Sequence, residues 1–277
     1  MKFKYLGTAA AEGFPAMFCE CDSCKKALKA GGKNIRTRSQ AIVDDKLLID
    51  FPPDTYMHVL YTGLELCKVK SLIMTHDHSD HLCSDDFGMR RVGFAYLKPG
   101  TTLTVYGTEA TCKKVTNTIN TCNLSNQNRV VFELITPFVP FNVEEYTVTA
   151  LKADHDPNCT PVFYIIGDNK KNIMYANDTG YFPDETWDYL EKNKPYLNFV
   201  SLDCTTGIKE CRHGHMGLST NAEVKERLIA IGCADQKTVF CVHHFSHNGL
   251  FIYDEIVPVA KEYGFSVSYD GMEISII

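Results

Sequence analysis

The sequence of 277 residues predicts an α+β fold in which stacked β-sheets are covered by helices. Short runs rich in β-branched and aromatic residues recur along the whole chain, and helical patterns fall between them. No Ser/Gly-rich linker, block of charge or internal repeat divides the chain. We therefore expect a single domain over residues 1–277, which is long enough to bury a large core.

The expected strands are short, and each is bounded by turn-forming residues. They are Lys2–Gly7, Gln40–Val43, Lys46–Asp50, Ser71–Thr75, Thr102–Tyr106, Val130–Thr136, Tyr146–Ala153, Pro161–Ile166, Asn172–Ala176, Asn198–Asp203, Thr238–His243, Phe265–Tyr269 and Met272–Ile276. Because they span the whole chain, sheets rather than helices are expected to form the framework.

Helices are expected between these strands. Pro183 suits the first turn of one helix, and Gly264 suits the end of another. Thr220 and Glu223 have the spacing of a capping box, in which each side chain binds the other residue's backbone amide. The expected helices are Asp54–Thr62, Glu109–Asn120, Asp184–Lys192, Thr220–Ile231 and Tyr253–Tyr263.

Composition and charge exclude several classes of protein. The net charge of -6 disfavours a nucleic-acid partner, because such proteins usually carry a basic surface. The N-terminal segment lacks the apolar region of a signal peptide, and no run of about 18 apolar residues exists to span a membrane. We therefore expect a cytoplasmic protein with reduced thiols and no membrane partner. Nine of its 12 cysteines are expected to be small buried side chains: Cys67, Cys83, Cys112, Cys122, Cys159, Cys204, Cys211, Cys233 and Cys241.

The strongest functional signal is a histidine-rich segment directly after the apolar run Ser71–Thr75. It places four side chains of metal-ligand type within six residues: His76, His78, Asp80 and His81. A strand end can hold such groups in fixed positions while the loop turns them inward. Imidazole and carboxylate groups are ligands for Zn²⁺ and related cations. An ordinary exposed polar loop has no use for this spacing, so the segment predicts a metal site.

The pattern His76-x-His78-x-Asp80-His81 after an apolar strand resembles the metallo-β-lactamase superfamily of dinuclear metallohydrolases. The resemblance implies a four-layer αββα sandwich with the metals at one edge. It also implies a lone His, an Asp and a late His farther along, each after a strand. The sequence supplies these in order as His155, Asp178 and His244.

Carried onto this chain, the resemblance implies two divalent cations, either Zn²⁺ or Mn²⁺. One would be held by His76, His78 and His155, the other by Asp80, His81 and His244, with Asp178 as the bridge. Asp80 would also belong to the catalytic machinery. His243 competes with His244 for the last position, and the spacing favours His244. Asp50 matches an early strand-end Asp that would orient a ligand histidine, although an Asp here could also simply begin the following turn.

A second cluster is the run Cys19-x-Cys21-x-x-Cys24. Three thiolates need one more nitrogen or sulfur to complete a tetrahedral zinc site, and the alternatives are unlinked thiols or a redox pair. The loop resembles that of the phosphoribosyl cyclic phosphodiesterases of the phosphonate carbon–phosphorus lyase pathway and their relatives. That resemblance implies a structural zinc site formed by the loop at residues 19–24 and His247, three residues after His244.

The same branch implies further site residues. A histidine at the position of His215 would protonate the leaving oxygen, which suits an imidazole with a pKa near 6.5. His213 competes for this role, and His215 could instead only stabilise the start of the next helix. Arg36 and Arg38 could bind a phosphate through their guanidinium groups, or form a solvated arm.

The expected function is that of a dinuclear metal-dependent phosphodiesterase. It would act on a small phosphate ester, with cyclic ribosyl esters among the candidates, by attack of a metal-bridging hydroxide. The turn Phe51–Asp54 and the loop Cys204–Arg212 depart from the branch and leave the substrate open. Thioester or ester hydrolysis is an alternative, as is a non-hydrolytic metal-binding protein of cofactor biosynthesis, which the intact ligand set disfavours. A homodimer also remains open.

Overall fold

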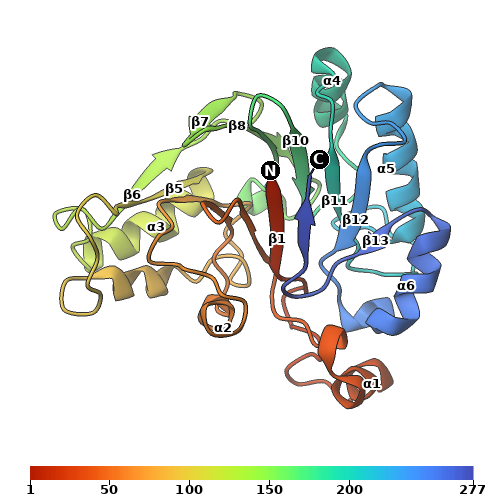
Figure 1. The fold of residues 1–277 in the computed structure, drawn as a ribbon, viewed down its shortest axis with the longest axis horizontal. Helices are drawn as coiled ribbons and strands as arrows, with labels where there is room; N and C mark the ends of the chain where they lie inside the picture. The colour runs from red at the N-terminus through yellow and green to blue at the C-terminus, as the bar shows by residue number, and fades with distance from the viewer. Residues whose placement is uncertain (277) are drawn as a thin grey trace.

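Two seven-stranded sheets form the framework of the protein (Figure 1). The computed structural model describes residues 1–276. The first sheet has the strand order β14-β1-β2-β3-β4-β5-β6, and the second has the order β13-β12-β11-β10-β9-β8-β7. The strands are β1 (Lys2–Gly7), β2 (Gln40–Val43), β3 (Leu47–Ile49), β4 (Ser71–Ile73), β5 (Leu103–Gly107), β6 (Val130–Leu134), β7 (Phe141–Val143), β8 (Tyr146–Lys152), β9 (Val162–Gly167), β10 (Asn172–Ala176), β11 (Phe199–Asp203), β12 (Val239–His243), β13 (Ser266–Val267) and β14 (Glu273–Ser275).

Helices lie around the two sheets, with α1 at one end of the molecule. They are α1 (Asp22–Ala30), α2 (Thr55–Tyr61), α3 (Glu109–Thr121), α4 (Asp184–Asn193), α5 (Leu218–Ala230) and α6 (Tyr253–Glu262). Helix α3 packs on the first sheet through Val115 and Ile119, whereas α4, α5 and α6 pack on the second, for example through Trp187 and Leu228. Short 3-10 helices occur at Gly32–Asn34, Ser84–Arg90, Pro157–Cys159 and His247–Gly249. The expected αββα sandwich is therefore confirmed.

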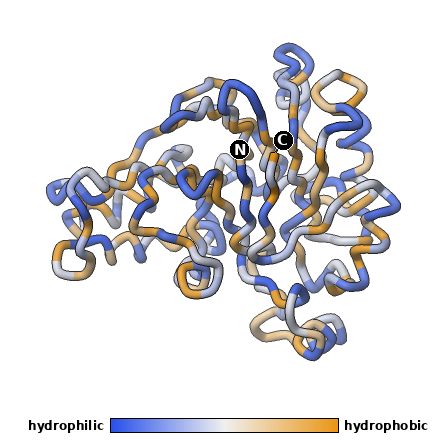
Figure 2. The backbone as a smooth tube through the Cα atoms, in the orientation of Figure 1, coloured by the Kyte–Doolittle hydropathy of each residue, from blue (hydrophilic) through white to orange (hydrophobic). Residues whose placement is uncertain are grey.

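The core between the sheets is rich in aromatic side chains. Phe3 and Tyr5 of β1 meet Tyr175 and Phe199 of the second sheet, and all four side chains are fully buried. Burial of such side chains is the dominant favourable contribution to folding. Figure 2 shows the corresponding pattern, with hydrophobic residues recurring along the central strands and mostly hydrophilic residues on the peripheral helix α4. No helix among the described residues is long and apolar enough to cross a membrane.

Several local expectations were wrong. Helix α1 and strand β7 were not expected, and the capping box at Thr220 does not form. Helix α5 begins two residues earlier at Leu218, with Gly217 as its N-cap, and Thr220 instead donates its hydroxyl to the carbonyl of Cys211. A Cβ at Gly217 would lie 2.1 Å from the carbonyl oxygen of Lys209, so only glycine fits at this close approach.

The cysteines are also less buried than expected. Of the nine assigned to packing, only Cys159, Cys204, Cys233 and Cys241 are buried, while Cys67 is exposed. The other four are partly accessible. Packing therefore explains fewer than half of these thiols.

Candidate active site

The site lies where strands from both sheets end at one edge of the sandwich. β3 and β4 run parallel to each other in the first sheet, as do β10, β11 and β12 in the second. Parallel strands present their carboxyl ends at the same edge. Asp50, His76, Asp178, Asp203 and His244 each lie at or within three residues of such an end. The topology thus brings together residues that are far apart in the sequence.

Strand β4 leaves its sheet before the histidine segment begins. It ends at Ile73, two residues earlier than expected, because the backbone amide of Thr75 donates to Oδ1 of Asp50 at 2.8 Å instead of continuing the ladder. The Thr75 hydroxyl contacts the same carboxylate and lies 3.0 Å from Nδ1 of His76. This bend turns His76 inward.

Three imidazoles form the first candidate ligand group: His76, His78 and His155. Nδ1 of His78 and Nε2 of His155 lie 3.3 Å apart. Two nitrogens bound to one tetrahedral cation at about 2.0–2.1 Å would be about 3.3–3.4 Å apart, so the spacing fits a shared metal ion. Burial lowers the pKa of His76 well below its usual value, which keeps the ring in the neutral form that binds metals.

Asp80, His81, Asp178 and His244 form the second candidate group. Oδ2 of Asp178 lies 2.5 Å from Nε2 of His81 and 3.5 Å from Nε2 of His76, so this carboxylate stands between the two groups. Oδ2 of Asp80 is 3.1 Å from Nε2 of His81. Although burial would raise the pKa of Asp80, the charge of His81 lowers it overall, and the carboxyl is ionised.

Most of these histidines are held by a second partner outside the group. Nδ1 of His81 lies 2.8 Å from Asp50, that of His155 lies 3.1 Å from the carbonyl of Gly214, and that of His244 lies 2.7 Å from the hydroxyl of Thr205. Such contacts fix the tautomer and leave the other nitrogen for a ligand bond. Asp50 therefore lies where its expected orienting role requires. Its backbone also has a positive φ of 64°.

Buried polar atoms of the two ligand groups converge in this region. Two buried ring nitrogens lack a hydrogen-bond partner among the described residues: Nε2 of His76 and Nε2 of His244. Buried polar atoms are normally paired, because an unpaired one costs about 1–3 kcal/mol. Imidazole nitrogens and a carboxylate oxygen converging in this way fit divalent cations.

His215 stands next to the second group. Its Nδ1 lies 3.0 Å from Oδ2 of Asp203 and 3.4 Å from Oδ1 of Asp178, which leaves Nε2 free. Burial alone would lower the pKa of His215, but the charge of Asp203 outweighs it and raises the pKa to about 9. A protonated imidazole in this position can donate a proton.

The competing histidines lie elsewhere. The side chain of His213 is 89% exposed and contacts Asp154. His243 is fully buried between the sheets, where its Nδ1 contacts the hydroxyl of Ser201 and the carbonyl of Leu202, and burial lowers its pKa to about 3. The structure thus brings His215 and His244, rather than His213 and His243, to the site.

A cavity of about 380 Å³ opens above the two groups. Seven of the side chains already described line it, and Glu12, Thr206, Ser246 and Asn248 add further polar groups. Ala10 and Ala11 form an apolar part of the wall. A volume near the lower end of the usual range of about 300–1,000 Å³ suits a small molecule.

The two candidate phosphate-binding arginines do not face this cavity. Arg36 is 3% exposed, and its Nη1 donates to the hydroxyl of Thr8 at 2.7 Å and the carbonyl of Ser268 at 2.8 Å. Arg38 donates through Nε to the carbonyl of Ala11 and pairs with Asp54 at 3.2 Å. This contradicts the expectation that Arg36 and Arg38 bind a phosphate, because both guanidinium groups bind protein atoms and neither residue lines the cavity.

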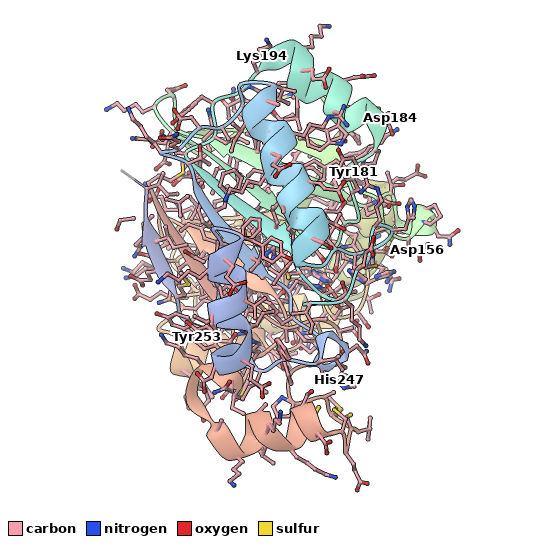
Figure 3. All side chains as sticks on the ribbon, turned by 90° about the vertical axis from the view of Figure 1, so that its right-hand side faces the viewer. Asp156, Tyr181, Asp184, Lys194, His247 and Tyr253 are labelled. Carbon is pink, nitrogen blue, oxygen red and sulfur yellow. The ribbon has the colours of Figure 1, made fainter. Side chains whose placement is uncertain are left out.

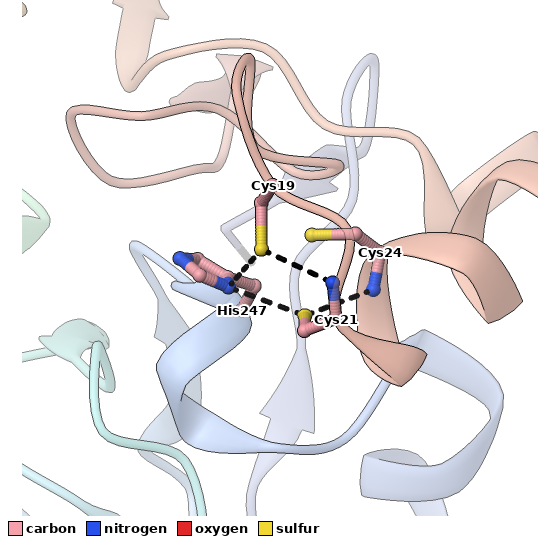
Figure 4. Close-up of side chains that lie close together, drawn as sticks. All are labelled: Cys19, Cys21, Cys24 and His247. Atoms are coloured by element: carbon pink, nitrogen blue, oxygen red, sulfur yellow. Dashed lines mark hydrogen bonds between the residues drawn. The ribbon is translucent and has the colours of Figure 1, made fainter.

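The cysteine cluster lies beside α1, at the end of the molecule where Figure 3 labels His247. Figure 4 shows Cys19, Cys21, Cys24 and His247 converging, with Nδ1 of His247 3.3 Å from Sγ of Cys19 and 3.4 Å from Sγ of Cys21. Sulfur and nitrogen ligands of one zinc ion would be about 3.5 Å apart, so this geometry fits the predicted structural site. Although burial would raise the pKa of Cys21, hydrogen bonds, first from the amide of Cys24, lower it to about 6.

Sequence reasoning missed three residues at the active site. Asp203 ends strand β11, and this strand-end position was a usable signal. Thr205 contacts both His215 and His244, and Glu12 lines the cavity. No local pattern marks Thr205 or Glu12, because each reaches the site only through the folding of a loop.

Comparison with known proteins identifies the family and the fold. The model of the beta-lactamase superfamily domain matches residues 46–244. Zn²⁺-bound PqqB from Methylobacterium extorquens superimposes with a TM-score of 0.76 at 18% identity, covering 99% of this chain and 100% of that one. A diphosphatase of the PhnP family gives 0.73 at 18% identity (100% and 98%), and the short form of human tRNase Z gives 0.68 at 16% (100% of both). Among curated proteins, no sequence matches this chain.

Proposed function

This chain belongs to the beta-lactamase superfamily, and we propose that it is a dinuclear metal-dependent phosphodiesterase of small phosphate esters. The observation that carries the proposal is the convergence of two ligand groups around Asp178, with buried ring nitrogens of His76 and His244 that lack a partner among the described residues. A site built for one cation would not need a carboxylate between two sets of ligands.

The contacts support one assignment of the ligands. His76, His78 and His155 would hold one cation, and Asp80, His81 and His244 the other, with Asp178 between them. When bound, two cations lower the pKa of a water molecule between them and stabilise negative charge on a phosphate. Zn²⁺ and Mn²⁺ both suit this mixed set of imidazole and carboxylate ligands.

The chain's own residues would complete the reaction. As water adds to phosphorus and the ester bond breaks, Nε2–H of His215 would give its proton to the departing oxygen. Asp203 holds Nδ1 of His215 at 3.0 Å, and Thr205 contacts the same nitrogen at 3.2 Å. Asp80 lines the cavity as an ionised ligand. The cavity has room for a small ester.

The thiol cluster would bind a structural zinc rather than a catalytic one. Three sulfurs and His247 account for all four positions of a tetrahedral ion, so no position stays open for a substrate. Such a zinc would join the N-terminal loop to the segment that follows His244.

The proposal is tested with bis(p-nitrophenyl) phosphate and a panel of cyclic and linear phosphodiesters on protein loaded with Zn²⁺ or Mn²⁺. We expect turnover by the wild type and its loss in His76→Ala. The exposed His213 gives the matched control, since His213→Ala should retain turnover. Wild-type protein with full metal occupancy that cleaves no phosphodiester would contradict the proposal.

A further inference from the structure

His78 differs from most of the proposed ligands in how its ring is held. Its side chain is 37% exposed, whereas those of His76, His81 and His244 are at most 2% exposed. Packing therefore restrains this ring less than the others, and its orientation has to come from polar contacts. Nδ1 of His78 faces Nε2 of His155 at 3.3 Å, so Nδ1 is the nitrogen that would bind the cation of the first ligand group. For this, Nδ1 must carry no proton.

The other nitrogen of the His78 ring meets a carboxylate. Nε2 of His78 lies 3.3 Å from Oδ2 of Asp156. Because an ionised carboxylate only accepts hydrogen bonds, Nε2 has to donate and therefore carries the proton. In a neutral imidazole the second nitrogen is then an unprotonated acceptor. The contact with Asp156 thus leaves the lone pair of Nδ1 for a cation.

Asp156 is itself fixed in place. It is the N-cap of the 3-10 helix Pro157–Cys159, and its Oδ1 accepts from the backbone amide of Asn158 at 2.9 Å and from the side-chain amide of the same residue at 2.8 Å. Oδ2 is therefore left for His78. The sulfur of Cys159 lies 3.8 Å from Nε2 of His78, but its S–H donates to the carbonyl of Asp156 at 3.1 Å. The carboxylate is thus the acceptor for Nε2–H.

The charge of Asp156 also acts on the first ligand group. That group consists of three imidazoles, whereas the second group includes the carboxylates of Asp80 and Asp178. A carboxylate behind a ligand imidazole orients the ring and strengthens its bond to a metal ion. Asp156 directly follows His155 in the chain, so one short segment supplies a ligand and holds the ring of His78.

Resting on the proposed function, we propose that Asp156 is a positioning residue, which holds His78 in the tautomer that offers Nδ1 to the cation of the first ligand group. It acts through His78 alone and is not a ligand itself. Loss of this contact should therefore weaken one of the two cations and leave the ligands of the other, which are held by Asp50 and Thr205, as they are.

Asp156→Asn tests this inference without a change in size. The two N–H donors of Asn158 need an acceptor, so the amide oxygen of the variant would face them and its NH₂ group would face Nε2 of His78. His78 would then carry its proton on Nδ1, where it blocks the cation. Asp168→Asn is the matched control. Asp168 likewise accepts from backbone amides of its own turn, and among the described residues no histidine contacts it.

Nitrogen NMR of the zinc-loaded protein reports the tautomer without any turnover. The ring of His78 should carry its proton on Nε2 in the wild type and in Asp168→Asn. In Asp156→Asn, we expect the proton on Nδ1. A wild-type His78 protonated on Nδ1, or the same tautomer in the wild type and Asp156→Asn, would overturn the inference.

Titration with Mn²⁺, followed by calorimetry, gives a second readout. Mn²⁺ prefers oxygen and nitrogen ligands to thiolates, so the thiol cluster does not compete for it. The wild type and Asp168→Asn should bind two Mn²⁺ ions per chain, and Asp156→Asn should bind one of them about 10–100-fold more weakly. Equal affinities in Asp156→Asn and the wild type would overturn the role of Asp156 while the dinuclear site stands. Wild-type protein that binds fewer than two cations at the active site, with Mn²⁺ or with Zn²⁺, would instead contradict the proposed function.

Discussion

Nδ1 of His215 lies 3.0 Å from Oδ2 of Asp203, and both residues adjoin the carboxylate of Asp178. The contact fixes the imidazole so that its other nitrogen is available to a substrate. His215 comes from the segment before α5 and Asp203 from the end of β11. A proton donor is thus held against the rigid edge of the second sheet.

If His215 protonates the departing oxygen, the fall in hydrolysis rate caused by replacing His215 should depend on the leaving group. His215→Ala should slow hydrolysis of an alkyl phosphodiester by about 10²–10⁴-fold. Cleavage of bis(p-nitrophenyl) phosphate should fall much less, because p-nitrophenolate leaves without protonation. Steady-state kinetics with both esters measure the difference. Equal losses on the two esters would contradict the role of His215, and His213→Ala should change neither rate.

Asp50 is predicted to act through His81. Its Oδ2 lies 2.8 Å from Nδ1 of His81, so the proton resides on Nδ1 and leaves Nε2 as the ligand. Asp50→Asn would present an amide N–H there and favour the wrong tautomer. We expect metal affinity to fall by about 10–100-fold with the fold intact, measured by competition with a chelating dye. Asp45→Asn is the control, since Asp45 is an exposed residue that also has positive φ. Equal affinity in Asp50→Asn and wild type would show that the contact is dispensable.

The cysteine loop is predicted to contribute to stability. Cys21→Ala removes one ligand of the proposed structural zinc, and we expect the loss of one zinc ion per chain. We also expect a fall in Tm of about 10 °C, corresponding to about 3 kcal/mol or more. Elemental analysis and thermal unfolding measure the two effects. The exposed Cys67 gives the control, Cys67→Ala. A variant with unchanged zinc content would refute the site.

His58 predicts a specific loss of stability in acid. Burial lowers its pKa to about 4, although Asp54 opposes the shift, and its ring contacts Gln40 and Thr37. The unfolded chain binds a proton near pH 6.5 and the folded chain only near pH 4. The free energy of unfolding should therefore decrease by about 3 kcal/mol as pH falls through this window.

Urea unfolding at a series of pH values tests this contribution. His58→Gln should be less stable than the wild type at pH 7, and its stability should depend less on pH between 6.5 and 4. His213→Gln should follow the wild-type profile, because His213 is exposed. Parallel pH profiles of His58→Gln and wild type would exclude His58 as the source.

The sequence predicted the position of a site residue where the pattern of neighbouring residues also determines its place in the fold. Strand ends carrying His76, His155 and Asp178 could be located from apolar runs, since a sheet edge is where such runs stop. Helix α1 was missed because it buries only Ser23, Cys24 and Ala27, and its cap is the thiol of Cys21, which is not a usual capping side chain.

Contacts between segments that are far apart in the sequence could not be predicted from the pattern of neighbouring residues. From the sequence, Arg36 was expected to be available for a phosphate or for solvent. In the folded chain it is buried against Thr8 and Ser268. Glu12 reads as an ordinary loop residue, yet the packing of its loop against the segment after β12 brings it to the cavity. The sequence therefore located the histidines and carboxylates that gather at the cavity better than the other residues of its wall.

The central claim is that two cations share the ligand groups joined by Asp178, with a third ion at the thiol cluster. The most direct test is a count of metal ions per chain by elemental analysis of the purified protein after loading and removal of excess metal. The account predicts three ions per chain in the wild type, two in Cys21→Ala, and fewer than three in Asp178→Ala with the thiol-bound zinc retained. A wild-type protein that retains a single ion in total would contradict it.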